Sequence, residues 1–450
     1  MFLTFRRAFA AWTLACALPS IAHAAAPEDQ AQWNFSGSVR LRYENVDGQV
    51  RPNFNGQDDL ISVRTILAAE RVQGPLRLMA EVYDSRVYAA DARTPISTNE
   101  VNTLELVQAF AELSLDSESL GKVKLQAGRF MLNLGSRRLV AADDYRNTTN
   151  GYTGLRADFA PAGVKTTLIY VMPQVRRPDD IQALLDNKQY PDTESTDLVL
   201  WGGMAAKPKA IGDATLEAVY YHLEERDAPG RPTRDRSLDT FGARLIRDPA
   251  PGKWDYEFEA YGQTGTVSSS TAATAAELDV RAGFFHADVG YTASSAWAPR
   301  LSAEFDYVSG DDDGARYGRF DTLFGMRRAD FGPSGIYAAI GRANLITPAV
   351  RLEVEPNERL DAFVAYRPMW LASRTDSFST TSVRDANGRS GRFAGHQLEG
   401  RVRYWAVPDL IRLEANAVWL AKGDFLTEAP NAPQTGDSST YVALSSIVSF

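Results

Sequence analysis

Charged side chains recur at every second position through much of this sequence, and these are the groups most able to do chemistry. Arg40, Arg42 and Glu44 alternate with Leu41 and Tyr43. Side chains that alternate with a period of two lie on opposite faces of a β-strand, so the pattern predicts one ionic and one apolar face. The cations are mostly arginine, with 40 Arg against 8 Lys. Because the planar guanidinium binds a carboxylate through paired hydrogen bonds, such faces favour the binding of carboxylate-bearing anions.

The same alternation repeats along the chain and predicts 18 strands. Short connections, such as 71–75 and 356–359, alternate strictly with long ones, such as 87–103 and 310–341. A transmembrane up-and-down barrel has tight periplasmic turns and longer external loops, and its strands need about nine to eleven residues to cross the bilayer. The predicted fold class is therefore all-β, an antiparallel up-and-down transmembrane β-barrel of 18 strands with long extracellular loops.

Several other protein classes are excluded. A soluble β-propeller would repeat about every 40 to 50 residues, and the sequence shows no such repeat. Beyond the N-terminus no window approaches the roughly 18 apolar residues of a membrane-spanning helix. The single cysteine, Cys16, excludes disulfide frameworks and cysteine-ligated metal sites. The net charge of −9 argues against nucleic acid as a partner.

Both ends of the chain carry export signals. Arg6 and Arg7 precede a short apolar run that ends at a small-residue cleavage site, which predicts a secretory signal peptide. Lipidation of Cys16 is the alternative, but the residues before it fit a lipoprotein poorly. The C-terminal segment 440–450 alternates and ends on Phe450, resembling the insertion signal of bacterial outer-membrane barrels. The predicted division of the chain is 1–24 for the signal peptide and 25–450 for one barrel domain in the bacterial outer membrane.

Three blocks of sequence resemble the alginate export family of outer-membrane proteins. They read LQAGRFMLNLGSRRLVAADDYRN (125–147), GYTASSAWAPRLSAEFDYVSGDDDGARYGRFDTLFG (290–325) and GHQLEGRVRYW (395–405). Where the family often has proline after Leu-Phe, this chain has Gly325. The resemblance extends over nearly the whole mature chain and implies a monomeric 18-stranded barrel through which a polyanionic polysaccharide crosses the outer membrane.

Inward-facing charges would line the lumen and form the solute path. The predicted pore-lining residues are Arg40, Arg42, Arg64, Arg77, Arg129, Arg137, Arg138, Arg146, Arg244, Arg351, Arg367, Arg401, Arg403, Arg412, Asp255, Glu257, Glu259, Glu304 and Asp306. The basic members gather on the first three strands and on two late ones, across the ring from the acidic strands 253–264 and 299–309. Opposed walls would produce a transverse field along which a uronate chain could move. The alternative is that these charges pair across the lumen and stiffen the barrel.

Two details of the predicted path concern particular segments. We expect the loop 131–151 to fold inward as a constriction that carries Arg137, Arg138 and Arg146, although an ordinary exposed loop is the alternative. Arg129 sits where the alternation of its strand breaks, as a β-bulge would allow, and the family pattern makes it a lumen candidate.

The sequence therefore predicts a passive channel for an anionic, alginate-like polysaccharide or oligosaccharide, with no catalytic residues, cofactor or bound metal. Its expected partners are the polymer, outer-membrane lipid and periplasmic export or uptake proteins. One alternative is a general or substrate-specific porin for small anionic solutes, and another is a hydrolase at the barrel rim that uses His222. Asp311, Asp312 and Asp313 could ligate Ca²⁺, but they lack the rest of a calcium loop, which favours a plain polar loop.

Overall fold

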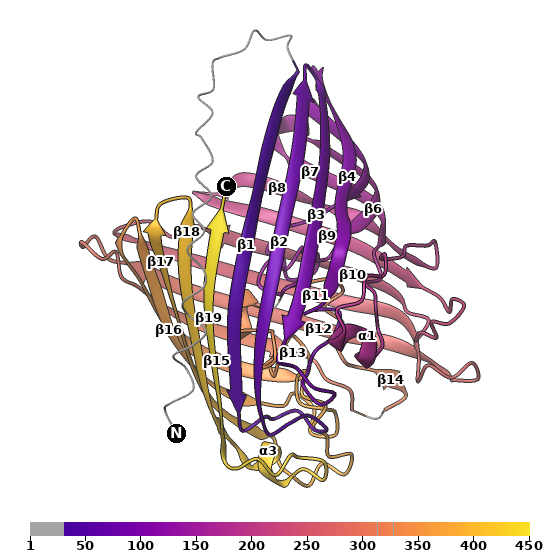
Figure 1. Cartoon of the computed structure of the whole chain (residues 1–450), viewed down its shortest axis with the longest axis vertical. Coiled ribbons are helices and arrows are strands. Elements are labelled where there is room, and N and C mark those ends of the chain that lie inside the picture. The colour runs from indigo at the N-terminus through magenta and orange to yellow at the C-terminus, as the bar shows by residue number, and fades with distance from the viewer. Residues whose placement is uncertain (1–30, 313, 327) are drawn as a thin grey trace.

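The computed structural model describes residues 31–450 except 313 and 327, so the predicted signal peptide lies outside the described residues. In the described part of the chain, 19 strands form one sheet in which the first strand pairs with the last. Eighteen of them are antiparallel and close into a barrel, since β13 pairs directly with β15 and the two-residue β14 lies parallel to β12. The predicted fold class is confirmed (Figure 1).

The strands follow the predicted order along the chain. They are β1 (Gln32–Asp47), β2 (Gln57–Gln73), β3 (Leu76–Tyr88), β4 (Asn102–Ser117), β5 (Gly121–Phe130), β6 (Tyr152–Phe159), β7 (Lys165–Pro173), β8 (Leu198–Ile211), β9 (Ala214–Glu225), β10 (Ser237–Arg247), β11 (Lys253–Ser268), β12 (Glu277–Thr292), β13 (Arg300–Val308), β14 (Arg316–Tyr317), β15 (Leu345–Asn357), β16 (Leu360–Trp370), β17 (Phe393–Val407), β18 (Ile411–Lys422) and β19 (Ser438–Ser449). The helices are α1 (Ile181–Leu185), α2 (Arg328–Phe331), α3 (Asp424–Glu428) and the 3-10 turn η1 (Pro161–Gly163). None of the helices within 31–450, gaps excepted, is long and apolar enough to cross a membrane.

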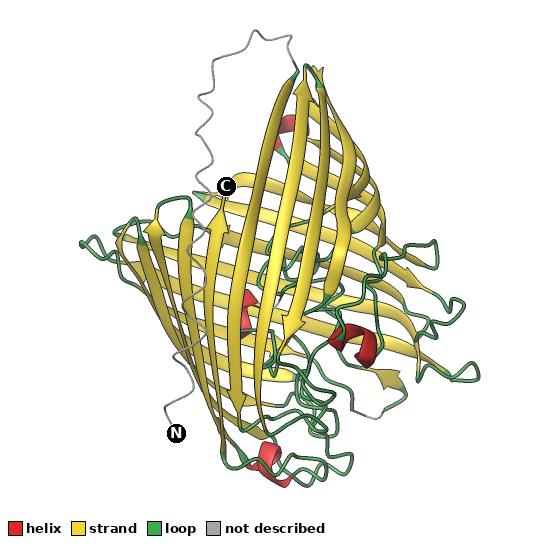
Figure 2. Cartoon of the chain, viewed as in Figure 1, coloured by secondary structure: helices red, strands yellow, loops and turns green. Residues whose placement is uncertain are grey.

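Loop lengths divide the barrel into two different ends. Figure 2 shows the long loops and most of the helices gathered at the lower end, and short turns joining the strands at the other. Gly74 and Gly212 adopt φ values of 55° and 58° in two of the short turns, a conformation that glycine reaches without a steric penalty. The C-terminus lies at the short-turn end (Figure 1).

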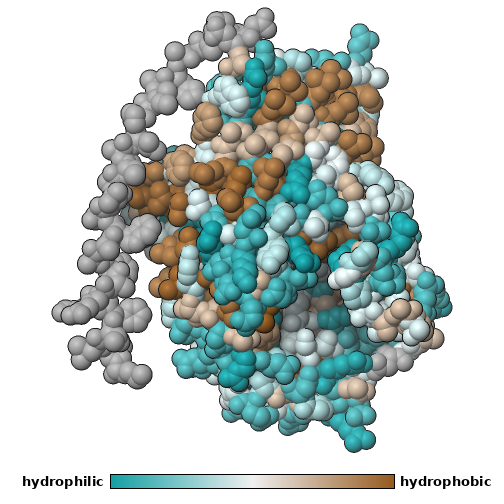
Figure 3. Space-filling view, turned by 45° about the vertical axis from the view of Figure 1, so that its right-hand side comes forward, coloured by the Kyte–Doolittle hydropathy of each residue, from teal (hydrophilic) through white to brown (hydrophobic). Residues whose placement is uncertain are grey.

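Alternation sorts the side chains between lipid and lumen. In β1, Arg40 and Arg42 are 2% and 3% exposed, whereas the intervening Leu41 is 52% exposed. Figure 3 shows apolar residues concentrated on the strand wall and polar residues around the loops below it. The predicted ionic interior and apolar exterior are therefore confirmed for β1.

Two long loops fold into the barrel and meet there. The loop 131–151, between β5 and β6, forms a parallel bridge with the loop 309–344 through Val140 and Phe324. The amide of Phe324 also donates to the carbonyl of Leu139 over 2.9 Å. Because a buried backbone must satisfy its hydrogen bonds, this pairing gives the two loops a shared, ordered path across the lumen.

The outward face makes a depth-dependent prediction. Val402 lies on the lipid side of β17 and Val407 at the turn that ends the strand, and both are exposed. We expect Val402→Arg to reduce the free energy of unfolding in lipid vesicles by about 2–4 kcal/mol, and Val407→Arg by only about 0–1 kcal/mol. Chemical denaturation of both variants measures the difference, and equal losses would contradict the assignment of this face to lipid.

Candidate functional site

A strongly basic cavity of about 350 Å³ lies in the lumen against β1, β2, β15, β17 and β18. Among the described residues, two carboxylates line it, those of Asp144 and Glu414. Eight arginines line it as well: Arg40, Arg42, Arg64, Arg137, Arg351, Arg401, Arg403 and Arg412. We call this space the basic cavity. Every one of these arginines belongs to the set predicted from the sequence.

Strand register concentrates the charge. Arg40 and Arg42 are two residues apart on β1, and Arg40 directly opposes Arg64 on β2. On the other side of the barrel seam, Arg403 opposes Glu414 in the β17–β18 ladder. Like charges directly opposite each other destabilise a sheet, so this arrangement requires compensating contacts.

The inserted loop supplies those contacts as neutral carbonyl groups. Arg40 donates to the carbonyls of Tyr145 and Arg146 at 3.0 and 2.7 Å, and Arg42 donates to that of Tyr145 at 2.8 Å. Arg64 donates to the carbonyl of Arg146 at 3.0 Å. Since a carbonyl satisfies the N–H donors without neutralising the guanidinium, the three side chains stay cationic. The expectation that the loop 131–151 folds inward is confirmed by these bonds.

The remaining arginines of the basic cavity have varied partners. Arg401 and Arg403 both hydrogen-bond Asp361, at 3.1 and 2.9 Å. Arg351 pairs with Glu353 at 2.9 Å and lies 3.8 Å from the centroid of the Phe363 ring. Neither Arg137 nor Arg412 makes a side-chain hydrogen bond or ion pair with a described residue, and the Nε of Arg412 is buried without a partner. Several guanidinium groups therefore retain donors for a ligand.

The acidic wall across the lumen is neutralised by arginines. Glu257 contacts both Arg138 and Arg244, and Asp255 pairs with Arg300. A second cavity, of about 260 Å³, is lined on this side by five arginines and six carboxylates among the residues that the structure describes. The predicted acids face the lumen, but they do not form a field of free carboxylates.

Arg138 links the inserted loop to this wall. Its guanidinium contacts Glu257, Glu259 and Asp330, the last at 2.9 Å. Burial by itself lowers the pKa of Arg138, but the charges of Glu259 and Glu257 more than offset this and raise the pKa above its ordinary value. One loop is thus held at both walls, by Arg138 on the acidic side and by its own carbonyls on the basic side.

Sequence reasoning missed Arg300, which pairs with Asp255 and Asp288 and lies 3.1 Å from Glu353. The available signal was its phase, because Arg300 is an even number of residues from Glu304, which faces the lumen. Its position at the first residue of β13 concealed that signal.

Other predicted residues lie in the barrel but outside the basic cavity. Arg77 pairs with Glu70 and Glu112 near the short-turn end, and Arg244 pairs with Glu217. Arg367 is fully buried, 3.4 Å from Glu304.

The side chain of Arg146 turns away from the basic cavity, although its carbonyl contributes to it. The guanidinium donates to Asn99 and Asn150 at 2.6 and 2.7 Å and pairs with Asp143. The prediction that the side chain of Arg146 lines the pore is therefore wrong for the basic cavity. Asn99, Asn150 and Asp143, which belong to the extracellular loops, bind its guanidinium instead.

Arg129 also departs from the prediction. The register of β5 is unbroken against both neighbours, and the irregularities lie instead between β3 and β4. Unbroken alternation puts Arg129 on the same face of β5 as Leu125, which is 45% exposed, and the neighbouring Gly128 has a φ of 124°. Arg129 is held between Glu105 and Glu194, both at 2.6 Å, so neither a bulge at Arg129 nor a place in the basic cavity is found.

The rim histidine shows no nucleophile beside it. The Nδ1 of His222 lies 2.9 Å from Asp239 and its Nε2 lies 3.4 Å from Glu224, and no serine hydroxyl hydrogen-bonds to it within the described part of the chain. In the predicted polar loop, Asp311 accepts a hydrogen bond from the amide of Gly318. Asp313 lies outside the described residues, and the described ones contain no group of three metal-ligating side chains.

Comparisons with known proteins agree with this architecture. The family model described as alginate export matches residues 31–439. A search of curated proteins gave no match.

Solved structures of similar fold are porins of pseudomonads. OccK8 (OprE) of Pseudomonas aeruginosa is 11% identical, with a TM-score of 0.58 over 93% of this chain and 98% of that one. A BenF-like porin from Pseudomonas fluorescens Pf-5 is 13% identical, with a TM-score of 0.58 over 93% and 99%. OccK2 (OpdF) of Pseudomonas aeruginosa, solved in complex with glucuronate, is 13% identical, with a TM-score of 0.54 over 93% and 97%.

The anchoring of the inserted loop can be tested at Asn147. Its amide donates to the carbonyl of Glu100 at 2.8 Å and accepts from Arg40 at 3.1 Å. Loss of these bonds in Asn147→Ala weakens the anchoring by about 1–3 kcal/mol. We expect a larger and noisier single-channel conductance in planar bilayers, whereas Asn34→Ala, at the periplasmic end of β1, where its amide donates to Glu70 and not to the inserted loop, leaves the conductance unchanged. A wild-type conductance in Asn147→Ala would contradict the account of the loop.

Proposed function

The chain belongs to the alginate export family and is an outer-membrane channel, and we propose that it passes an anionic polysaccharide or its oligomers through an arginine-lined lumen. The observation that carries the proposal is the basic cavity, where, among the described residues, eight arginines meet two carboxylates beneath the inserted loop.

The electrostatics of the lumen favour a carboxylate-bearing solute. Surrounding lipid has a low dielectric constant, so it focuses the field of the arginines into the water-filled space. A uronate carboxylate can exchange water for paired guanidinium donors, and it meets further arginines along the same wall. Several sites of moderate strength permit passage, because a solute must be able to leave each site as well as enter it. The transport is passive and requires no catalytic residue.

A second candidate is a channel for small anionic solutes, such as single uronic acids. The basic cavity has a volume of about 350 Å³, at the lower end of the range for small-molecule sites, which is about 300–1,000 Å³. The two inserted loops fill much of the lumen beside it. The fold shared with the glucuronate complex of OccK2 is consistent with this candidate. A polymer would need the loops to move, whereas a single sugar acid would not.

Arg137 and Arg412 provide the sharpest test, because removing their charge breaks no described hydrogen bond or ion pair. We expect Arg137→Gln/Arg412→Gln to weaken current blockade by an oligouronate about a hundredfold or more, because each of the two lost charge-assisted hydrogen bonds contributes about 1.5–3 kcal/mol. Planar-bilayer recordings with increasing oligouronate measure the blockade.

The matched control is Arg71→Gln/Arg226→Gln, which removes the same charge from two residues outside the basic cavity. Oligouronate should block the current through this control variant as strongly as it blocks the current through the wild type. Equal weakening in both variants would contradict a localised anion site. Blockade by monouronate as strong as that by the oligomer would favour the second candidate.

A further inference from the structure

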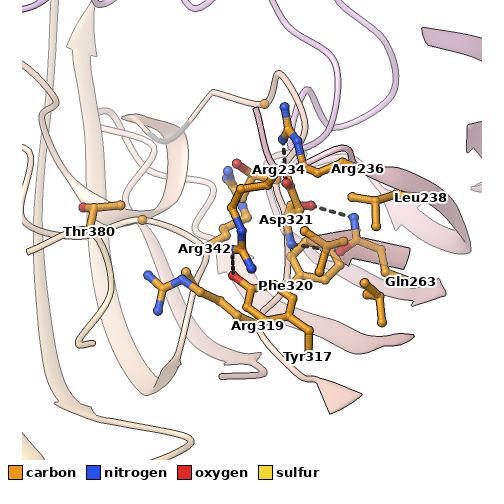
Figure 4. Close-up of a pocket in the computed structure, with 16 residues that line it drawn as sticks. Arg234, Arg236, Leu238, Gln263, Tyr317, Arg319, Phe320, Asp321, Arg342 and Thr380 are labelled. Carbon is orange, nitrogen blue, oxygen red and sulfur yellow. Dashed lines mark hydrogen bonds and ion pairs between the residues drawn. The ribbon is translucent and has the colours of Figure 1, made fainter. Parts of the chain in front are cut away.

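A separate cavity of about 270 Å³ opens among the extracellular loops (Figure 4). Its lining comes from the start of β10, the ends of β11 and β12 that lie nearest the long loops, and the loops 226–236, 309–344 and 371–392. In Figure 4, Leu238 and Gln263 lie on one side of it and Thr380 on the other. We call this space the outer cavity.

Four arginines and one carboxylate, that of Asp321, line the outer cavity among the residues described. Asp321 is already engaged by Arg236 at 2.7 Å, and Arg236 also pairs with Glu225. Arg319 pairs with Asp376 at 2.7 Å. The lining thus carries more positive than negative charge, although it belongs to a chain with a net charge of −9.

Arg234 is the cation best placed to take a ligand. It donates to the carbonyl of Ser268 at 2.7 Å and to the hydroxyl of Tyr317 at 3.1 Å, and its guanidinium lies 4.6 Å from the centre of the Tyr317 ring. No carboxylate among residues 31–450 that are described pairs with it. A guanidinium held in place by a ring and a carbonyl is oriented for a carboxylate but not neutralised.

Arg342 pairs with Asp330 and donates to the carbonyl of Met326, but one donor of its guanidinium has no partner. Its side chain is 3% exposed and lines the outer cavity, and its Nε has no hydrogen-bond partner. An unsatisfied buried donor costs about 1–3 kcal/mol, so a ligand oxygen at this point would be favourable. Burial lowers the pKa of Arg342 to about 9, which still leaves the group charged at neutral pH.

The rest of the lining suits a sugar ring. Tyr317 offers an aromatic face, and the hydroxyl of Thr380, which donates to the carbonyl of Ala338, can accept a hydrogen bond from a sugar hydroxyl, whereas the amide of Gln263 is engaged by Thr240 and Asp321. An apolar surface with a few placed polar groups is typical of small-molecule sites. The volume, slightly below that of the basic cavity, suits one sugar residue better than several.

The outer cavity is distinct from the basic cavity but close to it. The two share no lining residue, yet Gly325 lines the outer cavity and the next residue, Met326, lines the basic one. A Cβ at Gly325 would collide with the carbonyl of Arg138, so glycine permits the close contact of the two inserted loops here. The position where this chain departs from its family pattern is therefore the wall between the two cavities.

We propose that the outer cavity is a second binding site, which holds one carboxylate-bearing sugar residue at the extracellular mouth, with Arg234 binding the carboxylate. This inference rests on the proposed function, because the outer cavity would be a binding site for the same class of solute outside the inserted loops. Between a solute bound there and the basic cavity lies the loop segment that contains Gly325 and Met326.

Calorimetric titration of the full mature chain in detergent with glucuronate tests the inference. The wild type should bind two molecules per chain. Arg234→Gln should lose or weaken about tenfold the outer site and keep the other. Arg226→Gln, in the same loop but outside the outer cavity, should keep both, and Arg137→Gln/Arg412→Gln should weaken the inner site and keep the outer one.

The outcomes separate this inference from the proposed function. Two sites that persist unchanged in Arg234→Gln would overturn the outer site, while weakening in Arg137→Gln/Arg412→Gln would leave the proposed function standing. A single site that responds to Arg137→Gln/Arg412→Gln alone would do the same. Absence of saturable glucuronate binding in the wild type would overturn the outer site, as would equal binding of neutral glucose, whereas the proposed function stands or falls on blockade by the oligouronate. Heat-modifiability on gels confirms that each variant is folded.

Discussion

The constraint on which the structure depends is that lipid offers no hydrogen-bond partner to a strand, so the sheet must close on itself. The first and last strands meet that requirement, with Ser38 paired to Ser449 and Asp47 to Thr440 at the two ends of their ladder. Gly37 and Phe450 exchange two further backbone hydrogen bonds, of 2.8 and 3.0 Å. Once the sheet closes, strict alternation places the ionic side chains in the lumen.

The lumen accommodates this charge in two different ways. On the side of β11 to β13, carboxylates and arginines neutralise each other, as Arg300 does between Asp255 and Asp288. On the side of β1 and β2, backbone carbonyls of the inserted loop bind Arg40 and its neighbours without cancelling their charge. The first arrangement stiffens the barrel. The second leaves the arginines with an unneutralised positive charge. Charges of the first kind stabilise the fold, and charges of the second kind are available to a solute.

The strands and the inward arginines could be predicted because both follow from a period of two along a single strand. Arg40 and Arg412 lie 372 positions apart in sequence but on neighbouring faces of the same cavity, since register and closure are fixed by the alternation. The partners of Arg138 could not be predicted, because they depend on the path of a loop, which no periodicity encodes. The same is true of the outer cavity, whose lining comes from three loops and three strand ends.

The reversal potential of single channels in a potassium chloride gradient tests the central claim most directly. Although the chain carries a net charge of −9, the unneutralised arginines of the basic cavity predict that chloride carries most of the current. A reversal potential of the sign expected for potassium would contradict the account, because the total charge of the protein and not its arginine wall would then govern the pore.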